Sequence, residues 1–157
     1  MILEEACGIA APGARRKNIG IERLGWNEAP FAGDQTLLRQ LFLILLENAI
    51  KYSETATTIR VGIEVLNGRP CVTVRDEGIG IAAEYLPHIF ERFYRAAPDP
   101  NEESRSGGLG LAIAQAIIQA HHGAIECSSK VGEGSAFTLW FPSESTTPSA
   151  ERTHTLA

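Results

Sequence analysis

Residues 76–80 read Asp76-Glu77-Gly78-Ile79-Gly80 and follow a stretch, 69–75, whose pattern predicts a β-strand. Glycine permits positive φ and close backbone approach, so the two glycines predict a turn that presents Asp76. A carboxylate in such a turn can accept a hydrogen bond from the exocyclic amine of adenine, which guanine does not supply at that position. Asp76 is therefore predicted to select adenine. The alternative is an ordinary turn after a strand, where Asp and Gly are common.

A second segment, 47–52, lies at the end of a strong helical period and reads Glu47-Asn48-Ala49-Ile50-Lys51-Tyr52. Asn48, Lys51 and Tyr52 are three and four positions apart, so they share one face of the helix. An amide oxygen is a hard ligand that suits Mg²⁺, a lysine neutralises phosphate charge, and a tyrosine packs against a base or ribose. The alternative is a polar helix face that is merely solvated.

A third segment, 107–111, opens another predicted helix and reads Gly107-Gly108-Leu109-Gly110-Leu111. Free amide hydrogens and the positive end of the helix dipole suit a phosphate at this place. No strand precedes the segment, as a dinucleotide fingerprint requires, and the Gly-Lys-Ser/Thr ending of a P-loop is missing. The three segments together predict a pocket for a magnesium nucleotide.

Composition limits what can surround this pocket. The chain has 157 residues, of which 44% are hydrophobic, and this predicts one compact α+β domain. The formal net charge is −5 and the 14 basic residues are dispersed, which argues against a nucleic-acid partner. Three separated cysteines, Cys7, Cys71 and Cys127, predict small core residues rather than a disulfide framework or a zinc site.

The apolar runs are short. Polar residues such as Arg39 and Glu47 interrupt them, so no run reaches the roughly 20 apolar residues of a membrane span. The first residues lack the basic and apolar regions of a signal peptide. We therefore expect a cytoplasmic domain that does not itself enter a membrane, although it can be the cytoplasmic part of a larger membrane-anchored sensor.

The strongest predicted helix follows Asp34, which suits its N-cap. Its apolar residues recur at helical spacing and predict a stripe that faces the core, formed by Leu38, Leu41, Phe42, Leu45 and Ala49. Two strands follow, 57–66 and 69–75, and the pair Asn67-Gly68 between them favours a tight hairpin.

Weaker periods predict four further segments, namely a helix over 2–11 ending before Pro12, an alternating stretch over 17–24, a short helix over 82–92 and a helix over 109–122. Gly123 suits the C′ position of the last helix. A closing hairpin is expected from strands 124–129 and 135–141 around the glycine turn 132–134. Hairpins beside helices predict a two-layer α/β sandwich with a mixed sheet and helices on one face.

Five motifs in this order resemble the ATP-binding catalytic domain of sensor histidine kinases, in the GHKL superfamily that also includes type II topoisomerases, heat-shock chaperones and mismatch-repair ATPases. They are an N box at 47–53, a G1 box at 76–80, an F box at 89–95, a G2 box at 107–113 and a last glycine turn at 132–137. The resemblance covers about 2–142, and the F box points to the kinase branch. It implies a Bergerat fold over residues 1–142. Residues 143–157 are rich in serine and threonine and are expected to form a disordered tail.

The resemblance also implies roles for matching residues. Asn48 would ligate Mg²⁺, Asp76 would hold adenine, and Lys51 and Arg95 would contact the phosphates of ATP. Residues 96–107 would form a mobile lid that Phe90 and Phe93 anchor. The full nucleotide-binding set implied is Asn48, Lys51, Tyr52, Asp76, Gly78, Gly80, Arg95, Gly108, Leu109, Gly110 and Leu111.

The reaction implied is transfer of the γ-phosphoryl group of ATP to a histidine, in which the domain supplies positioning and charge neutralisation. No phosphoacceptor motif is evident in this sequence, and His121 and His122 instead suit the end of a helix. The partners implied are a histidine-bearing dimerisation domain of the same kinase and, through the full-length protein, a response regulator. The isolated chain is expected to be inactive without that histidine domain.

Two positions depart from the family pattern. Ile44 occupies the place, four residues before Asn48, where the kinases often have a second asparagine and the ATPase branches have a glutamate base. Ser106 replaces the first glycine of the G2 box. An ATP-binding sensor or docking module without phosphotransfer therefore stays as the alternative, and an ATPase of the chaperone or topoisomerase branch is a third, which Ile44 disfavours.

Overall fold

The central helix, α2 (Gln35–Tyr52), forms as the apolar period predicts. The computed structural model describes residues 1–26, 29, 32–94 and 108–143. Asp34 caps the helix, because its side chain accepts a hydrogen bond of 3.0 Å from the amide of Leu37. The predicted stripe is buried, with every member at most 2% exposed, and its members are Leu38, Leu41, Phe42, Leu45 and Ala49. Both predictions for this helix are confirmed.

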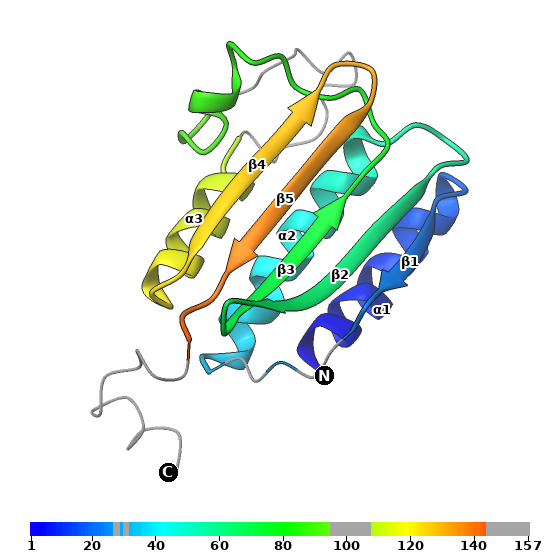
Figure 1. The fold of residues 1–157 in the computed structure, drawn as a ribbon. Coiled ribbons are helices and arrows are strands. Elements are labelled where there is room, and N and C mark those ends of the chain that lie inside the picture. The colour runs from blue at the N-terminus through cyan, green and yellow to red at the C-terminus, as the bar shows by residue number, and fades with distance from the viewer. Residues whose placement is uncertain (27–28, 30–31, 95–107, 144–157) are drawn as a thin grey trace.

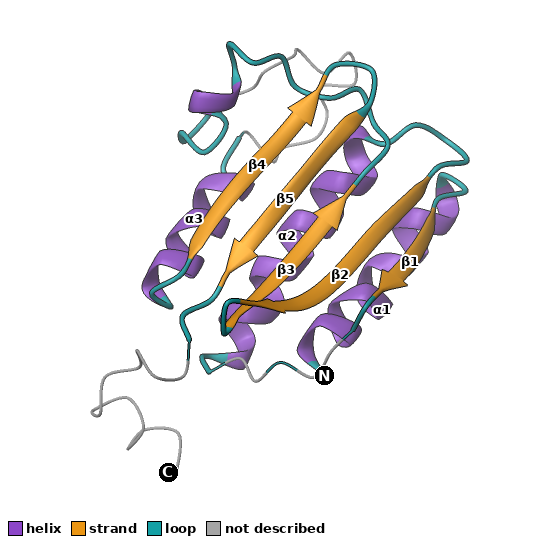
Figure 2. Cartoon of the chain, in the orientation of Figure 1, coloured by secondary structure: helices purple, strands orange, loops and turns teal. Residues whose placement is uncertain are grey.

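A five-stranded mixed sheet lies against the helices (Figure 2). Its strands are β1 (Gly20–Leu24), β2 (Thr58–Leu66), β3 (Arg69–Arg75), β4 (Ala124–Lys130) and β5 (Gly134–Trp140). The spatial order is β1-β2-β3-β5-β4, in which β1 runs parallel to β2 and the other neighbours are antiparallel. Asn67 and Gly68 have φ values of 53° and 75° and form the predicted tight turn between β2 and β3.

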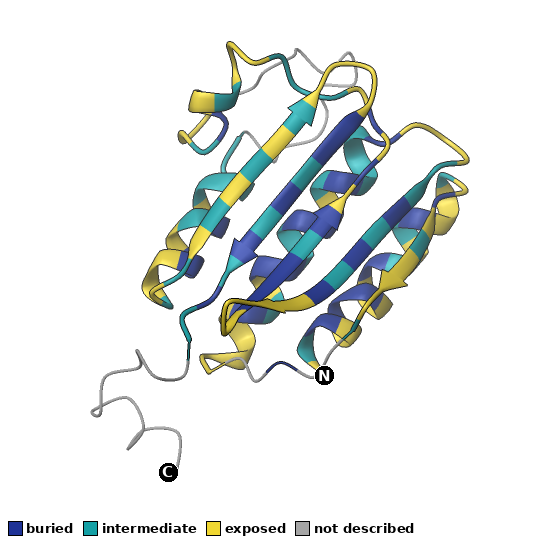
Figure 3. Ribbon diagram, viewed as in Figure 1, coloured by how far each residue is buried: buried dark blue, intermediate teal, exposed yellow. Residues whose placement is uncertain are grey.

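Three helices, α1 (Ile2–Arg16), α2 and α3 (Gly110–Ala120), cover one face of this sheet (Figure 1). Alternate strand residues point toward them, so the buried positions of the central strands form one continuous core with α2 (Figure 3). The α+β fold class, with two layers and helices on one face, is therefore confirmed. Among the described residues, no helix is long and apolar enough to cross a membrane.

Helix α1 is longer than predicted, because it continues through Pro12 to Arg16. Proline removes one helical hydrogen bond, which usually ends a helix. Here Ala10 and Ala14, on either side of Pro12, are buried in the core. Burial of this face holds the helix together past the proline, so tertiary packing decides its length.

The short helical segment predicted over 82–92 forms only in part. The segment consists of successive three-residue turns, of which only η1 (Leu86–His88) is a 3₁₀ helix. Its backbone bonds join each amide to a carbonyl three residues earlier, as from His88 to Tyr85 and from Glu91 to His88. Pro87 has no amide hydrogen for an α-helical bond, and the buried Ile89 fixes the segment to the core.

Helix α3 ends in a Schellman motif. His122 takes the left-handed conformation with φ 60°, and the amides of His122 and Gly123 donate to the carbonyls of Gln119 and Ile118. The prediction that Gly123 is the C′ residue is therefore off by one position. Gly123 is needed for another reason, because a Cβ there would lie 2.2 Å from the carbonyl oxygen of Trp140.

His121, at the same end of α3, reaches the beginning of α2. Its Nδ1 lies 2.7 Å from the carbonyl of Ile117, and its Nε2 accepts a hydrogen bond of 3.1 Å from the amide of Asp34. Since a carbonyl can only accept and an amide can only donate, these two contacts fit the tautomer that carries its proton on Nδ1. His121 therefore connects two helices and does not simply face the dipole of its own helix.

All three cysteines are free, as predicted. Cys7 belongs to the helix-facing core and Cys127 packs against its edge. Cys71 is buried outside that core, because β3 points its neighbour Val72 toward the helices and Cys71 toward the opposite face. The prediction of a small buried residue therefore holds for Cys71, although it is buried on the other face of the sheet.

Gly123→Ala is expected to destabilise the domain, because the new methyl group cannot avoid the backbone of β5. We expect a loss of about 2–4 kcal/mol in the free energy of unfolding, measured by urea titration. Gly8→Ala is the matched control, since a Cβ there meets nothing within 4 Å. It should gain about 0.5–1 kcal/mol through helix propensity. Equal effects of the two substitutions would contradict the steric explanation.

Candidate functional site

Asp76 lies at the end of β3 and is only 4% exposed. Its Oδ1 accepts two backbone hydrogen bonds, from Gly78 at 2.9 Å and from Ser135 at 3.2 Å. The Asp76 amide in turn donates to the Ser135 carbonyl at 2.9 Å. The carboxylate is thus fixed between its own turn and the start of β5.

The two glycines of this turn meet backbone from other elements. A Cβ on Gly78 would lie 2.2 Å from the carbonyl oxygen of Tyr52, at the end of α2. Gly80 has φ 73°, and a Cβ there would lie 2.1 Å from the carbonyl oxygen of Lys130, at the end of β4. The turn therefore fits only with glycine at both positions, as the sequence pattern suggested.

A cavity of about 300 Å³ opens beside Asp76. Its wall is mostly apolar and takes residues from the turn, from the segment after it and from the β4–β5 connection, including Ile79, Ile81, Tyr85, Tyr94 and Val131. Asn48 and Tyr52 of α2 line the same space. A mostly apolar cavity with one buried carboxylate suits a planar ring that carries a hydrogen-bond donor.

A second cavity of about 160 Å³ adjoins the first, and Asn48, Tyr52 and Leu111 line both. The second cavity is also lined by Lys51, Gly108 and Gly110, which do not line the first. The second cavity therefore lies between the end of α2 and the beginning of α3. The amino end of an 11-residue helix, a lysine and two glycines give this end a positive character.

The structure brings most of the predicted set together. Asn48, Lys51, Tyr52, Asp76, Gly80, Gly108, Gly110 and Leu111 line the two cavities. Gly78 and Leu109 line neither cavity. Gly78 packs against the backbone of Tyr52, and Leu109 immediately precedes the first residue of α3. Arg95, the lid 96–107 with Ser106, and the tail from residue 144 lie outside the described residues.

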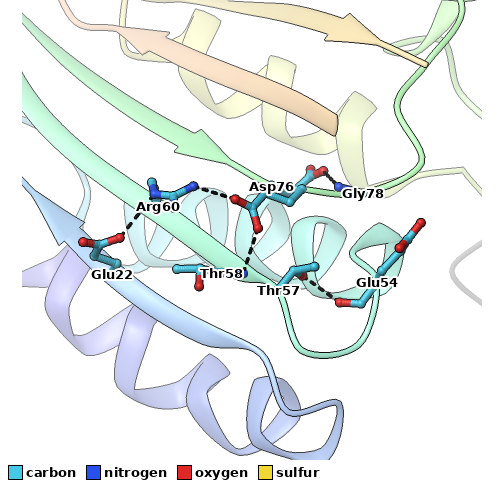
Figure 4. Close-up of polar contacts among 8 residues, drawn as sticks. Glu22, Glu54, Thr57, Thr58, Arg60, Asp76 and Gly78 are labelled. Carbon is cyan, nitrogen blue, oxygen red and sulfur yellow. Dashed lines mark hydrogen bonds and ion pairs between the residues drawn. The ribbon is translucent and has the colours of Figure 1, made fainter. Parts of the chain in front are cut away.

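The adjacent carboxylates of Asp76 and Glu77 have different partners. Asp76 accepts a hydrogen bond from Gly78 (Figure 4), whereas Glu77 accepts from Arg60 and from the amide of Thr58. Burial raises the pKa of Asp76, and the hydrogen bonds from Gly78 and Ser135 oppose that rise. Glu77 is exposed, and its carboxylate lies 2.9 Å from Arg60, whose hydrogen bond lowers the pKa of Glu77. Only Asp76 is therefore available to a ligand in the cavity.

The two F-box phenylalanines behave differently. Phe90 packs edge-on against Phe137 of β5, with ring centroids 6.3 Å apart, and belongs to the core margin. Phe93 is 67% exposed, has φ 66°, and donates its amide to the carbonyl of Gly108 at 3.1 Å. Phe93 thus joins the F box to the first glycine of the described G2 segment.

Sequence reasoning assigned no role to two polar residues that line these cavities. Ser135 is buried beside Asp76, and its hydroxyl lies 2.7 Å from that of Ser129. Glu47 lines the second cavity with Ile44, Asn48 and Lys51. The spacing of these four residues at i, i+3, i+4 and i+7 could have identified Glu47, because it places them on one helix face.

Known proteins match this geometry. The family described as histidine kinase-, DNA gyrase B- and HSP90-like ATPases matches residues 33–145. The chain belongs to this family. Within the family it is an ATP-binding catalytic domain of the sensor histidine kinase type, as the order of motifs predicted.

Its relatives include sensor histidine kinases from different bacteria. YkoH of Bacillus subtilis is 48% identical over 108 residues, which cover 69% of this chain and 23% of YkoH. CusS of Escherichia coli is 38% identical over 124 residues, which cover 78% of this chain and 26% of CusS. The chain therefore spans about a quarter of the length of these curated relatives.

Solved structures of this kinase-type domain superpose on the chain. The mycobacterial sensor histidine kinase MprB has a TM-score of 0.77 at 25% identity, covering 90% of this chain and 93% of that one. Full-length ShkA in complex with AMPPNP has a TM-score of 0.77 at 28% identity, covering 90% of this chain and 29% of ShkA. The fold of the kinase-type domain is thus the one predicted.

Asp76→Asn is expected to leave the ligand-free kinase-type domain at least as stable as the wild type near pH 7. The raised pKa means that the folded state favours the protonated carboxyl, so the stability from this group is present below pH 3.8, the ordinary pKa, and is lost as the pH rises through the folded pKa. The side-chain amide of asparagine does not ionise, so the variant does not lose this stability as the pH rises. Its amide oxygen can still accept the hydrogen bonds from Gly78 and Ser135. Urea titrations should show the advantage disappearing toward about pH 3.

Glu77→Gln is the matched control for that measurement. The lowered pKa of Glu77 means that its stabilisation is present above pH 4.5 and disappears as the pH falls. The substitution should therefore have the opposite sign, with a small and salt-sensitive effect because the ion pair is exposed. A lower stability of Asp76→Asn than of Glu77→Gln near pH 7 would show that desolvation does not dominate at Asp76.

Proposed function

We propose that this domain binds Mg²⁺-ATP and transfers its γ-phosphoryl group to a histidine on a separate dimerisation domain of the same kinase. The observation that supports this most is the continuity of the two cavities, which runs from the carboxylate of Asp76 past Asn48 to the amino end of α3. An extended ligand with a flat apolar end and an anionic end matches this shape and polarity.

The adenine ring is assigned to the larger cavity. There the buried carboxylate of Asp76 accepts a hydrogen bond from the exocyclic amine, while Ile79, Tyr85 and Val131 contact the faces and edges of the ring. Backbone amides already hold Oδ1 of Asp76, so the other carboxylate oxygen is the one directed to the ligand. Because the carboxylate is buried and fixed, its loss leaves the amine without a partner.

The phosphates are assigned to the smaller cavity. Lys51 neutralises their charge, and the backbone of the G2 segment, 108–111, presents amides at the positive end of α3. Arg95 is proposed to contact the phosphates from the F box. These groups hold the phosphoryl chain in one position, which is the main contribution of a protein to phosphoryl transfer.

The residues present fit a magnesium ion at the phosphate end. The amide of Asn48 and the carboxylate of Glu47 line the same cavity, and both provide hard oxygen ligands. We propose Asn48 as the direct ligand, with Glu47 beside it. When bound, Mg²⁺ supplies further neutralisation of phosphate charge.

The acceptor histidine is proposed to come from outside this chain. His88 pairs with Glu91 at 2.9 Å on the surface, and His121 bridges α3 and α2, so both already have partners within the domain. The matching sensor kinases are longer proteins, which supports a preceding histidine domain and a response regulator as partners, and a cytoplasmic location. Ile44, at the wall of the phosphate cavity, keeps a sensor module without transfer as the second candidate.

Transfer is tested by mixing the domain with the histidine-bearing domain from its natural kinase and γ-labelled ATP. We expect an acid-labile phosphohistidine on the partner, which is lost when Asp76→Asn or Asn48→Ala replaces the wild type. Glu77→Gln should transfer normally, because Glu77 faces away from the cavity. Nucleotide binding without any labelled histidine would favour the sensor module.

Nucleotide choice is tested by calorimetry in the presence of Mg²⁺. ATP and ADP should bind, whereas GTP should bind at least about 100-fold more weakly, because a carbonyl would face the carboxylate of Asp76 in place of the amine. Asp76→Asn should weaken ATP and narrow this difference. Equal affinities of the wild type for ATP and GTP would remove the assigned role of Asp76.

A further inference from the structure

The carboxyl end of α2 is held by a lysine from a distant part of the chain. The Nζ of Lys17 donates to three carbonyl oxygens, those of Ile50 at 2.7 Å, Lys51 at 3.2 Å and Ser53 at 2.8 Å. Lys17 lies just after α1, more than 30 residues earlier in the sequence. This contact was not predicted, and it is separate from the cavities.

These bonds complete the hydrogen bonding at the end of the helix. The last four carbonyls of a helix have no partner within it. In α2 the carbonyl of Ala49 accepts from the amide of Ser53, and that of Tyr52 accepts from the amide of Ile79 in the G1 turn. Lys17 takes the two that remain, so each of the four carbonyls has a donor.

The segment around Lys17 is itself fixed to the chain that follows α2. The carbonyl of Lys17 accepts from the amide of Ala56 at 3.4 Å, and the amide of Gly20 donates to the carbonyl of Thr57 at 3.1 Å. The ammonium group is therefore delivered by an anchored backbone on both sides. The fixed backbone limits the positions that the ammonium group can reach, although the side chain still loses rotamer freedom when it is held.

We propose that Lys17 is a positioning residue of the nucleotide site, which it supports through the last turn of α2. That turn carries Lys51 and Tyr52, and the carbonyl of Tyr52 holds the G1 turn through Ile79. Lys17 also places a positive charge at the negative end of the dipole of α2, the helix whose last turn carries Lys51. The inference depends on the proposed function, because it concerns the geometry of the same site.

The charge has a second consequence for an anionic ligand. Without Lys17 the free carbonyls of Ile50 and Lys51 would leave partial negative charge at the end of the helix that lines the phosphate cavity. Loss of the lysine therefore acts twice, by loosening the last turn and by making the local potential less favourable to phosphate. Both effects weaken nucleotide binding without removing any group that touches the nucleotide.

The test compares Mg²⁺-ADP binding by calorimetry for the wild-type chain, Lys17→Met and Lys17→Arg. We expect Lys17→Met to raise Kd about tenfold and Lys17→Arg to restore most of the affinity, because a guanidinium keeps the charge and offers several donors. Amide hydrogen exchange at Ile79 should speed up in Lys17→Met and remain slow in Lys17→Arg. Lys17→Gln, which keeps a donor but no charge, replaces Lys17→Met if that variant does not fold.

Ile63→Val controls for a general loss of stability, because Ile63 is buried in β2 and lines neither cavity. It should lower Tm and leave Kd unchanged. If Lys17→Met binds Mg²⁺-ADP as the wild type does, or if Ile63→Val weakens binding equally, Lys17 has no positioning role and the proposed function stands. If the wild-type chain binds no nucleotide, the proposed function itself fails.

Discussion

Close backbone contact around the Asp76 turn is the constraint on which this domain depends. Gly78 lies against the carbonyl of Tyr52, Gly80 against that of Lys130, and Gly134 against that of Asp76 itself, each with no room for a Cβ. The turn is therefore fitted between the end of α2 and the connection of β4 to β5. Segments about 25 and 55 residues away in the chain meet there because main chain can approach main chain only where side chains are missing.

This fit explains why a carboxylate can be kept in an unfavourable place. Burial raises the pKa of Asp76, and the opposing hydrogen bonds come from backbone groups that the turn holds in position. The carboxylate of Asp76 is thus a poorly solvated hydrogen-bond acceptor in the wall of a mostly apolar cavity. Such arrangements are typical of sites that recognise a ligand. The neighbouring Glu77 faces solvent and Arg60, which keeps a second charge away from the cavity.

The sequence predicted those parts of the fold that local rules determine. Asp34 and the apolar stripe after it identified α2, and Asn67-Gly68 identified the hairpin, because capping and turn geometry depend on a few adjacent residues. The length of α1 was not predicted, because burial on both sides of Pro12 acts through the finished structure. The segment 82–92 forms only the short 3₁₀ helix η1, and here the sequence did hold a local signal, since Pro87 lacks the amide hydrogen that a longer helix needs.

The site shows the same limit. The motifs placed Asn48, Lys51 and Asp76 in one predicted site, and these residues line two adjoining cavities. Lys17 belongs to none of the motifs, and only the folded chain shows what its ammonium group contacts.

Both ends of α2 are tied to other elements, with His121 of α3 on the amide of Asp34 at the beginning and Lys17 on the carbonyls at the end. A helix gripped in this way cannot slide along its axis or turn about it without breaking bonds at both ends. Within the described part of the chain, α2 therefore acts as a fixed reference frame. If a bound ligand requires the site to change shape, we therefore expect the loops around the cavities to move, while α2, which carries Asn48, stays in place.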